Sequence, residues 1–249
     1  MIRQCLLVCR PEGIAQAKNF EIVEAPHQPL GEGEIRVRNH FLSVEPAMRG
    51  WIADKGNYAE PVAIGSVMRA LTAGVVTETR HADYAIGDAV TGWFGWQEEA
   101  AAPASAVVRK IAETDLPLSL SLGILGINGV TAHLALTGIG KPKPDETLLV
   151  STAAGAVGSA VGQIGKLLGC RRVGIAGGPD KVKLCLERFG YDAAIDYKAG
   201  DLRAALAHTC PEDIDIYFDN TAGAISDAVL AHLALRARVV VCGTAAIAR

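Results

Sequence analysis

The sequence predicts an α/β protein, with an antiparallel β domain followed by a doubly wound parallel sheet. Three observations indicate this fold class. Short alternating strands with glycine turns occupy residues 1 to about 120, and apolar strands alternate with helical segments from about residue 145. A glycine-rich loop joins the first of these later strands to the helical segment that follows it. We therefore expect two domains, over residues 1–120 and 121–249.

The composition is that of a folded protein. Its 24 Lys and Arg residues nearly balance 27 Asp and Glu residues, and the net charge of −3 argues against a nucleic-acid or anionic-membrane partner. Hydrophobic residues make up 50% of the chain, which is enough for a buried core. The longest uncharged stretches contain glycine and polar residues, and the apolar run 5–9 is too short for a signal peptide. We expect a cytoplasmic protein that does not enter a membrane.

The N-terminal elements indicate a small antiparallel β unit. Residues 34–38 alternate polar and apolar side chains, as a half-buried strand does. Residues 67–80 and 89–100 are rich in β-forming residues, with glycines at turn positions around them. We interpret this unit as a partly closed barrel.

The C-terminal elements indicate a parallel sheet, because strands and helices alternate and parallel strands need crossover connections. The first predicted helix has Val157, Val161, Ile164 and Leu168 at helical spacing, and the next has Val182, Leu186 and Phe189 on one face. The remaining helices are expected over residues 202–208 and 225–235. The expected strands are residues 148–151, 173–176, 193–197, 214–218 and 239–242. A six-stranded dinucleotide-binding sheet would continue further, so we expect an incomplete sheet with an apolar edge.

The loop Ala153–Gly158 follows the first parallel strand and opens the next helix. It matches the dinucleotide motif G-x-G-x-x-G, with alanine at the first position. Gly155 would let the backbone approach a pyrophosphate, and Gly158 would let the helix pack closely on the strand. The alternative is a glycine-rich turn that only permits tight packing.

The end of the second parallel strand favours NADP(H) over NAD(H). An acidic residue there would bind the ribose 2′-hydroxyl of NAD, but this chain has Gly177 and Gly178, followed by Lys181. The glycines leave room for a 2′-phosphate and the ammonium attracts it. Asp180 weakens the charge argument, and the alternative for Lys181 is a solvated surface lysine.

Cysteine and histidine spacing gives little support to a metal site. The six cysteines form no Cys-x-x-Cys pair, and the six histidines show no His-Glu-x-x-His spacing. We expect no zinc centre, and we expect most cysteines to be small buried residues without disulfides.

Several segments together are more specific than the glycine loop alone, and through them essentially the whole chain resembles one family. The resemblance is to the zinc-independent medium-chain dehydrogenase/reductases, and within them to the NADP-dependent alkenal/enone double-bond reductases that include prostaglandin and curcumin reductases. The matching segments are residues 41–50, 92–97, 125–132, 153–162, 194–198 and 218–220.

The resemblance implies a GroES-like N-terminal domain, a Rossmann-type C-terminal domain and a set of NADP(H)-binding residues. In the family, the matched positions contact the pyrophosphate, the 2′-phosphate and adenosine, and the ribose and nicotinamide. Those positions here are Gly155, Ala156, Val157 and Gly158, then Lys181 and Tyr197, then Asn220, Cys242 and Gly243. Without the family, Tyr197 would be a packed aromatic and Asn220 a capping amide.

The resemblance also implies a catalytic role for Tyr58, which matches a tyrosine that contacts the substrate carbonyl. A phenol there would stabilise the negative charge that develops on an enone oxygen. The alternative is an ordinary aromatic in a loop. Trp93, Phe94 and Trp96 fit pocket walls and a hydrophobic core equally well.

Relatives continue beyond the position of Gly243 with a sixth strand and further active-site contacts, whereas six residues follow it here. The leading expectation is NADPH-dependent reduction of the carbon–carbon double bond of a small conjugated carbonyl compound. The alternatives are quinone reduction and a noncatalytic NADP(H)-binding protein. A homodimer is left open.

Overall fold

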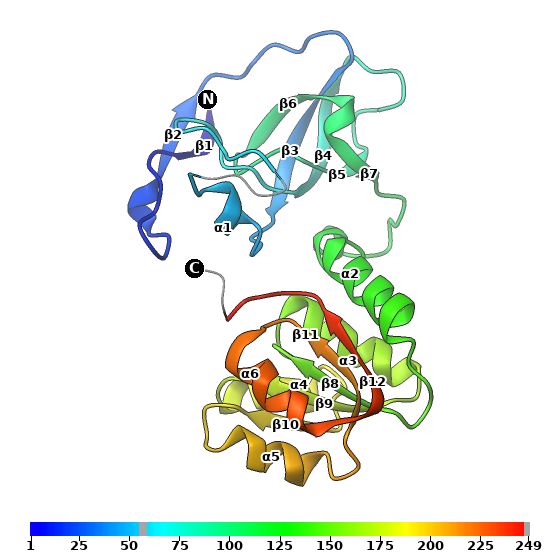
Figure 1. The fold of residues 1–249 in the computed structure, drawn as a ribbon. Helices are drawn as coiled ribbons and strands as arrows, with labels where there is room; N and C mark the ends of the chain where they lie inside the picture. Colours follow the sequence, from blue (N-terminus) through cyan, green and yellow to red (C-terminus); the bar gives the residue numbers. More distant parts are fainter. Residues whose placement is uncertain (55–58, 247–249) are drawn as a thin grey trace. The chain divides into compact units, whose positions relative to one another are not determined.

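The computed structural model describes residues 1–54 and 59–246. The chain divides into two compact units, the first ending at Leu122 and the second beginning at Gly123. Figure 1 shows the helices and strands of both units. Among the described residues, no helix combines the length and apolar character that a membrane span requires.

Unit 1 contains a two-stranded and a five-stranded antiparallel sheet. The first pairs β1 (Ile2–Leu7) with β2 (Phe20–Ala25). The second has the strand order β6-β3-β4-β5-β7. Its strands are β3 (Glu34–Leu42), β4 (Thr72–Thr79), β5 (Ala89–Gly92), β6 (Glu99–Pro103) and β7 (Val107–Lys110). The helical elements are η1 (Ala17–Asn19), α1 (Met48–Trp51), η2 (Ala104–Ala106) and η3 (Leu118–Leu122).

Two hydrophobic clusters stabilise unit 1. One lies within the larger sheet and includes Ile35, Val37 and Phe94, each at most 2% exposed. The other includes Leu7 and Trp51, with Trp96 packed against it. The core therefore accounts for Phe94 and Trp96, whereas Trp93 is 43% exposed with its ring edge-on to Trp51.

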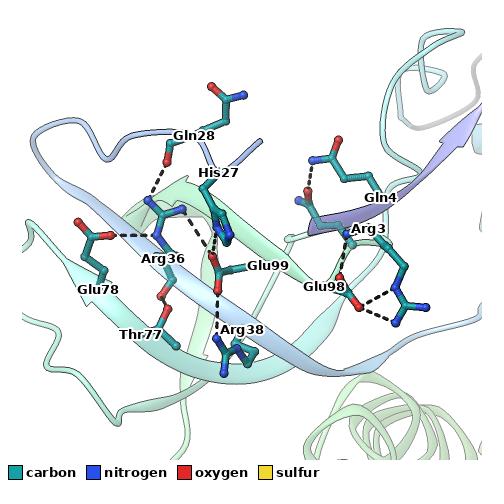
Figure 2. Close-up of polar contacts among 11 residues, drawn as sticks. Arg3, Gln4, His27, Gln28, Arg36, Arg38, Thr77, Glu78, Glu98 and Glu99 are labelled. Atoms are coloured by element: carbon teal, nitrogen blue, oxygen red, sulfur yellow. Dashed lines mark hydrogen bonds and ion pairs between the residues drawn. The ribbon is translucent and has the colours of Figure 1, made fainter. Parts of the chain in front are cut away.

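A buried carboxylate joins strands and loop within unit 1 (Figure 2). Glu99, at the start of β6, has its side chain 6% exposed and lies 2.8 Å from Nδ1 of His27. The guanidinium groups of Arg36 and Arg38, both on β3, lie 3.7 Å from its two oxygens. The neighbouring Glu98 instead forms an exposed pair with Arg3. Glu99 thus ties the segment before β3 to the sheet.

Unit 2 is a five-stranded parallel sheet with the order β10-β9-β8-β11-β12. Its strands are β8 (Thr147–Ser151), β9 (Arg171–Ala176), β10 (Ala193–Asp196), β11 (Ile214–Asp219) and β12 (Leu233–Val241). Its helical elements are α2 (Ile127–Ala135), η4 (Leu136–Gly140), α3 (Ala156–Leu167), α4 (Pro179–Glu187), α5 (Leu202–Thr209), α6 (Gly223–Val229) and η5 (Leu230–His232).

Helices cover both faces of this sheet (Figure 1). Leu148 and Val150 pack with residues of α2, α3 and α4 on one face. Leu149 faces the other way and packs with residues of α5 and α6. The two faces alternate along β8, as side chains of a strand do, and every residue of β8 is buried. The predicted fold class, an antiparallel GroES-like β domain with a doubly wound Rossmann-type sheet, is confirmed.

The predicted helix over residues 225–235 is wrong in its last part. The helix α6 ends at Val229, a short 3₁₀ turn follows, and Leu233 already pairs with Ile214 of β11. Ile225, Val229 and Leu233 repeat at helical spacing and all pack on one core cluster, so the apolar pattern continues where the helix does not. A register shift and the positive φ of Arg236 (67°) accommodate extra residues in β12. This strand forms one edge of the sheet, with Leu235 and Val241 exposed.

All six cysteines are unpaired. Three are buried, two are partly buried and one is exposed. They are, in that order, Cys170, Cys185 and Cys210, then Cys5 and Cys242, then Cys9. The structure shows no disulfide among these six, and three of them, rather than most, are buried as predicted.

Candidate cofactor site

The residues predicted to bind a cofactor follow the carboxyl ends of the five strands of unit 2. The glycine loop follows β8, Gly178 and Lys181 follow β9, and Tyr197 follows β10. Asn220 follows β11, and Cys242 with Gly243 follows β12. Strand order reverses between β8 and β11, and open parallel sheets bind ligands beside such a reversal. The fold therefore brings these residues to one edge of one sheet.

The glycine loop is shaped by Thr152, whose φ of 51° turns the chain sharply after β8. Its carbonyl accepts the N–H of Gly155 at 2.8 Å. A Cβ at Gly158 would lie 2.3 Å from that same carbonyl oxygen, and one at Gly155 would lie 2.8 Å from the Thr152 Cγ2. The loop therefore requires glycine at Gly158 and favours it strongly at Gly155.

The helix α3 offers free main-chain donors at this loop. Gly155 is its N-cap residue and has no side chain to accept the N–H groups of the first turn, which also lacks an acidic residue. Ala156, Val157 and Gly158 supply N–H groups that have no carbonyl one turn earlier within the helix. These donors and the positive end of the helix dipole suit an anion. The loop thus fits the pyrophosphate of a dinucleotide.

A second turn, after β9, is held open by Asp196 at the end of β10. Its Oδ1 accepts the N–H groups of Gly178 and Lys198, each at 2.9 Å. These backbone hydrogen bonds lower the pKa of the Asp196 carboxyl below its usual range. Gly178 has a φ of 98°, which glycine adopts without strain, and a Cβ there would meet open space.

Tyr197 lies against this turn, because a Cβ at Gly177 would come within 2.8 Å of its ring. The ring is 40% exposed, and the Lys198 ammonium lies 5.9 Å from its centroid. Lys181 is exposed in the first turn of α4 and has no ion-pair partner in the described part of the chain, and its neighbour Asp180 is exposed too. The turn thus presents one aromatic face and two cations.

Asn220 is held against β8. Its main-chain N–H donates to the hydroxyl of Ser151 at 2.8 Å, and its side-chain Nδ2 donates to the carbonyl of Ser151 at 2.7 Å. The carbonyl of Asp219 accepts the N–H groups of Cys242 and Gly243. A Cβ at Gly243 would lie 3.0 Å from the Asn220 carbonyl oxygen. These contacts join the end of β8 to the segments that follow β11 and β12.

The side chain of Asp219 is the centre of this arrangement and is 4% exposed as a residue. It accepts hydrogen bonds from the hydroxyls of Ser226 (2.6 Å) and Tyr217 (3.0 Å) and from the main-chain N–H of Thr221 (2.9 Å). Burial alone would raise the pKa of the Asp219 carboxyl, but these hydrogen bonds outweigh it and lower that pKa. Burial, and then the Asp219 charge, raises the pKa of the Cys242 thiol.

Sequence reasoning missed Ser151, Asp196 and Asp219. Asp196 and Asp219 lie in segments that match the family, residues 194–198 and 218–220, but the match implies no role for either side chain. The predicted catalytic residue Tyr58 lies outside the described residues. In the described ranges, no three His, Cys, Asp or Glu side chains form a group that could hold a metal. Because this holds only for the described residues, the expected absence of a metal stays a prediction.

Comparisons with known proteins cover both units. The family model described as the N-terminal domain of oxidoreductase matches residues 3–110, and the model described as zinc-binding dehydrogenase matches residues 156–248. The chain is 44% identical over 241 residues to the NADPH-dependent curcumin reductase of Escherichia coli K12, covering 97% of this chain and 70% of that protein. It is 42% identical over 217 residues to the NADP(+)-dependent 2-alkenal reductase of Nicotiana tabacum, covering 86% and 63%.

A solved structure gives the same likeness. CurA of Vibrio vulnificus in complex with NADPH superimposes with a TM-score of 0.93 and 41% identity, over 99% of this chain and 73% of that one. The chain thus spans 70% of the length of the Escherichia coli curcumin reductase and 73% of that of Vibrio vulnificus CurA.

Proposed function

Since the chain belongs to the alkenal, prostaglandin and curcumin reductase family of the medium-chain dehydrogenase/reductases, we propose that it reduces the carbon–carbon double bond of small conjugated aldehydes or ketones with NADPH. The observation that carries this proposal is the glycine loop. It combines free N–H groups at the start of α3 with a glycine at Gly158 that leaves no room for a Cβ and a glycine at Gly155 where a Cβ would crowd the Thr152 side chain. Such a loop suits a dinucleotide pyrophosphate.

The preference for NADPH over NADH is supported by the turn after β9. Gly178 leaves open space, and the exposed Lys181 on α4 and Lys198 after β10 supply two positive charges in this region, against one negative charge from the exposed Asp180. The negative charge of Asp196 is engaged by two backbone N–H groups of the same region. A dianionic 2′-phosphate would gain charge-assisted contacts here, and a bare ribose hydroxyl would not.

The proposed chemistry is delivery of a hydride, which NADPH supplies when bound, to the β-carbon of the enone. The chain binds and orients the cofactor through the loops of unit 2. Negative charge then develops on the substrate carbonyl oxygen, and the Tyr58 phenol is the proposed donor to that oxygen. Protonation of the resulting enolate at its α-carbon completes the reduction and restores the carbonyl group.

The other predicted properties remain part of this proposal. The partner is a small conjugated carbonyl compound rather than nucleic acid or a membrane, and the compartment is the cytoplasm. The names of the Escherichia coli and Nicotiana tabacum relatives state an NADP-dependent reductase function, which supports the same function for this chain.

Two measurements on the 249-residue chain test the proposal. Calorimetric titration should give tighter binding of NADPH than of NADH, and equal affinities would contradict the cofactor assignment. NADPH consumption should then be followed with a 2-alkenal, with a quinone and without substrate. Consumption with the alkenal supports the proposed reaction. Consumption with the quinone alone would favour quinone reduction, and NADPH binding without any turnover would favour a noncatalytic binding protein.

A further inference from the structure

Ser151 is the last residue of β8 and is completely buried. Both of its oxygens accept hydrogen bonds from one residue of the neighbouring strand's loop, Asn220. The Ser151 hydroxyl accepts the Asn220 main-chain N–H at 2.8 Å, and the Ser151 carbonyl accepts the Asn220 side-chain Nδ2 at 2.7 Å. Backbone and side chain of Asn220 are therefore fixed from the same residue.

These contacts determine which way the Asn220 amide faces. A main-chain carbonyl can only accept hydrogen bonds, so the NH₂ end of the amide must face Ser151. The reverse orientation would bring two acceptor oxygens to hydrogen-bond distance from each other. The amide oxygen Oδ1 of Asn220 is thereby directed away from Ser151, where it is an acceptor available to a ligand.

The orientation of the Ser151 hydroxyl is set in turn by Asp219. The hydroxyl lies 3.3 Å from Asp219 Oδ1 and donates to it, because an ionised carboxylate only accepts. With its hydrogen committed to Asp219, the hydroxyl presents a lone pair to the Asn220 N–H. The chain of contacts therefore runs from the buried carboxylate through Ser151 to Asn220.

We infer that Ser151 is a positioning residue that orients Asn220, so that the Asn220 amide oxygen accepts a hydrogen bond from a ribose hydroxyl of bound NADPH. This inference rests on the proposed function. It assigns a role to a completely buried residue that would act through Asn220.

Two serines provide a matched test, because both donate a hydrogen bond to the Asp219 carboxylate. Ser226 on α6 does so at 2.6 Å, a shorter distance than that of Ser151, and its hydroxyl hydrogen-bonds with Asp219 and Tyr217 rather than with Asn220. Ser151→Ala removes the hydroxyl that accepts the Asn220 main-chain N–H and keeps the main-chain carbonyl that accepts Asn220 Nδ2. Ser226→Ala perturbs the same carboxylate from its other side. Ser151→Thr keeps the hydroxyl.

The affinity for NADPH should be measured by titration in the native chain and the three variants, with the melting temperature of each. We expect Ser151→Ala to weaken NADPH binding about three- to tenfold, the range for one neutral hydrogen bond. Ser226→Ala should lower the melting temperature while its NADPH affinity stays within about twofold of native. Ser151→Thr should restore most of the affinity that Ser151→Ala loses.

Equal NADPH affinity of the native chain and a folded Ser151→Ala variant would overturn this inference and leave the proposed function standing. Equal losses of affinity in Ser151→Ala and Ser226→Ala would also overturn it, because the effect would then be a general loosening around Asp219. A native chain that binds no NADPH would overturn both the inference and the proposed function.

Discussion

At the scale of single residues, Lys181 provides the clearest test of cofactor choice. Lys181→Ala should weaken NADPH binding about tenfold and leave NADH binding nearly unchanged, since only NADPH carries the 2′-phosphate. Lys183→Ala, on the same helix, is the matched control because the Lys183 ammonium lies 4.0 Å from Glu187. Titration of both variants with both cofactors gives, for each variant, the ratio of the NADH dissociation constant to the NADPH dissociation constant. Similar ratios in the two variants would remove Lys181 from the site.

Asp219 predicts how stability responds to acid. Its pKa is lowered in the folded chain, so the carboxylate contributes stability that is fully present above the unfolded pKa of about 3.9. That contribution is lost as the pH falls through the lower, folded pKa. The difference in unfolding free energy between native and Asp219→Asn should therefore be larger at pH 7 than at pH 3.

Urea unfolding followed by circular dichroism at the two pH values measures this difference. Asp227→Asn, an exposed position on α6, is the control and should change the unfolding free energy little at either pH. A difference between native and Asp219→Asn that stays constant from pH 7 to pH 3 would contradict the assigned role of the carboxylate.

At the scale of elements, two glycines, one at the N-cap of the helix α3 and one within it, are expected to have different roles, Gly155 in cofactor binding and Gly162 in packing. A Cβ at Gly162 would lie 2.5 Å from the Tyr191 ring and 2.8 Å from the Phe189 carbonyl oxygen. Gly162→Ala should therefore cost about 1 to 3 kcal/mol of stability through overpacking. Gly155→Ala should chiefly weaken NADPH binding, because its side chain would stand at the donor end of the helix. Melting curves and NADPH titrations of both variants test these two expectations. A larger loss of NADPH affinity in Gly162→Ala than in Gly155→Ala would contradict them.

The strand β6 supplies a second matched pair, Glu98 and Glu99. Glu99→Gln should lower the unfolding free energy of unit 1 by about 1.5 to 3 kcal/mol, because a buried charge-assisted cluster with His27 and Arg36 is lost. Glu98→Gln should have a much smaller effect, since both members of its pair with Arg3 are exposed. Thermal unfolding followed by tryptophan fluorescence reports unit 1, which holds all three tryptophans. Equal losses of unfolding free energy in Glu98→Gln and Glu99→Gln would show that burial of the Glu99 carboxylate does not strengthen its contacts.

Short sequence patterns predict some features of these elements and miss others. Apolar spacing and the glycine loop predict the strands β8 to β12 and the helices between them, because these signals lie within short windows. The contact of Ser151 with Asp219 joins residues 68 positions apart and depends on β8 and β11 being neighbours. The same neighbour effect turns residues 233–235 into strand, since pairing with β11 outweighs a helix-like apolar repeat.

At the scale of the whole molecule, the proposed function makes unit 2 the cofactor-binding unit and Tyr58, in the N-terminal region, the residue that contacts the substrate. Its central claim is the position at which the substrate is reduced. The most direct test supplies NADPH deuterated at the transferred position together with a conjugated enone, and analyses the product. The account predicts a saturated ketone with deuterium on the β-carbon. An allylic alcohol with deuterium on the former carbonyl carbon would contradict it.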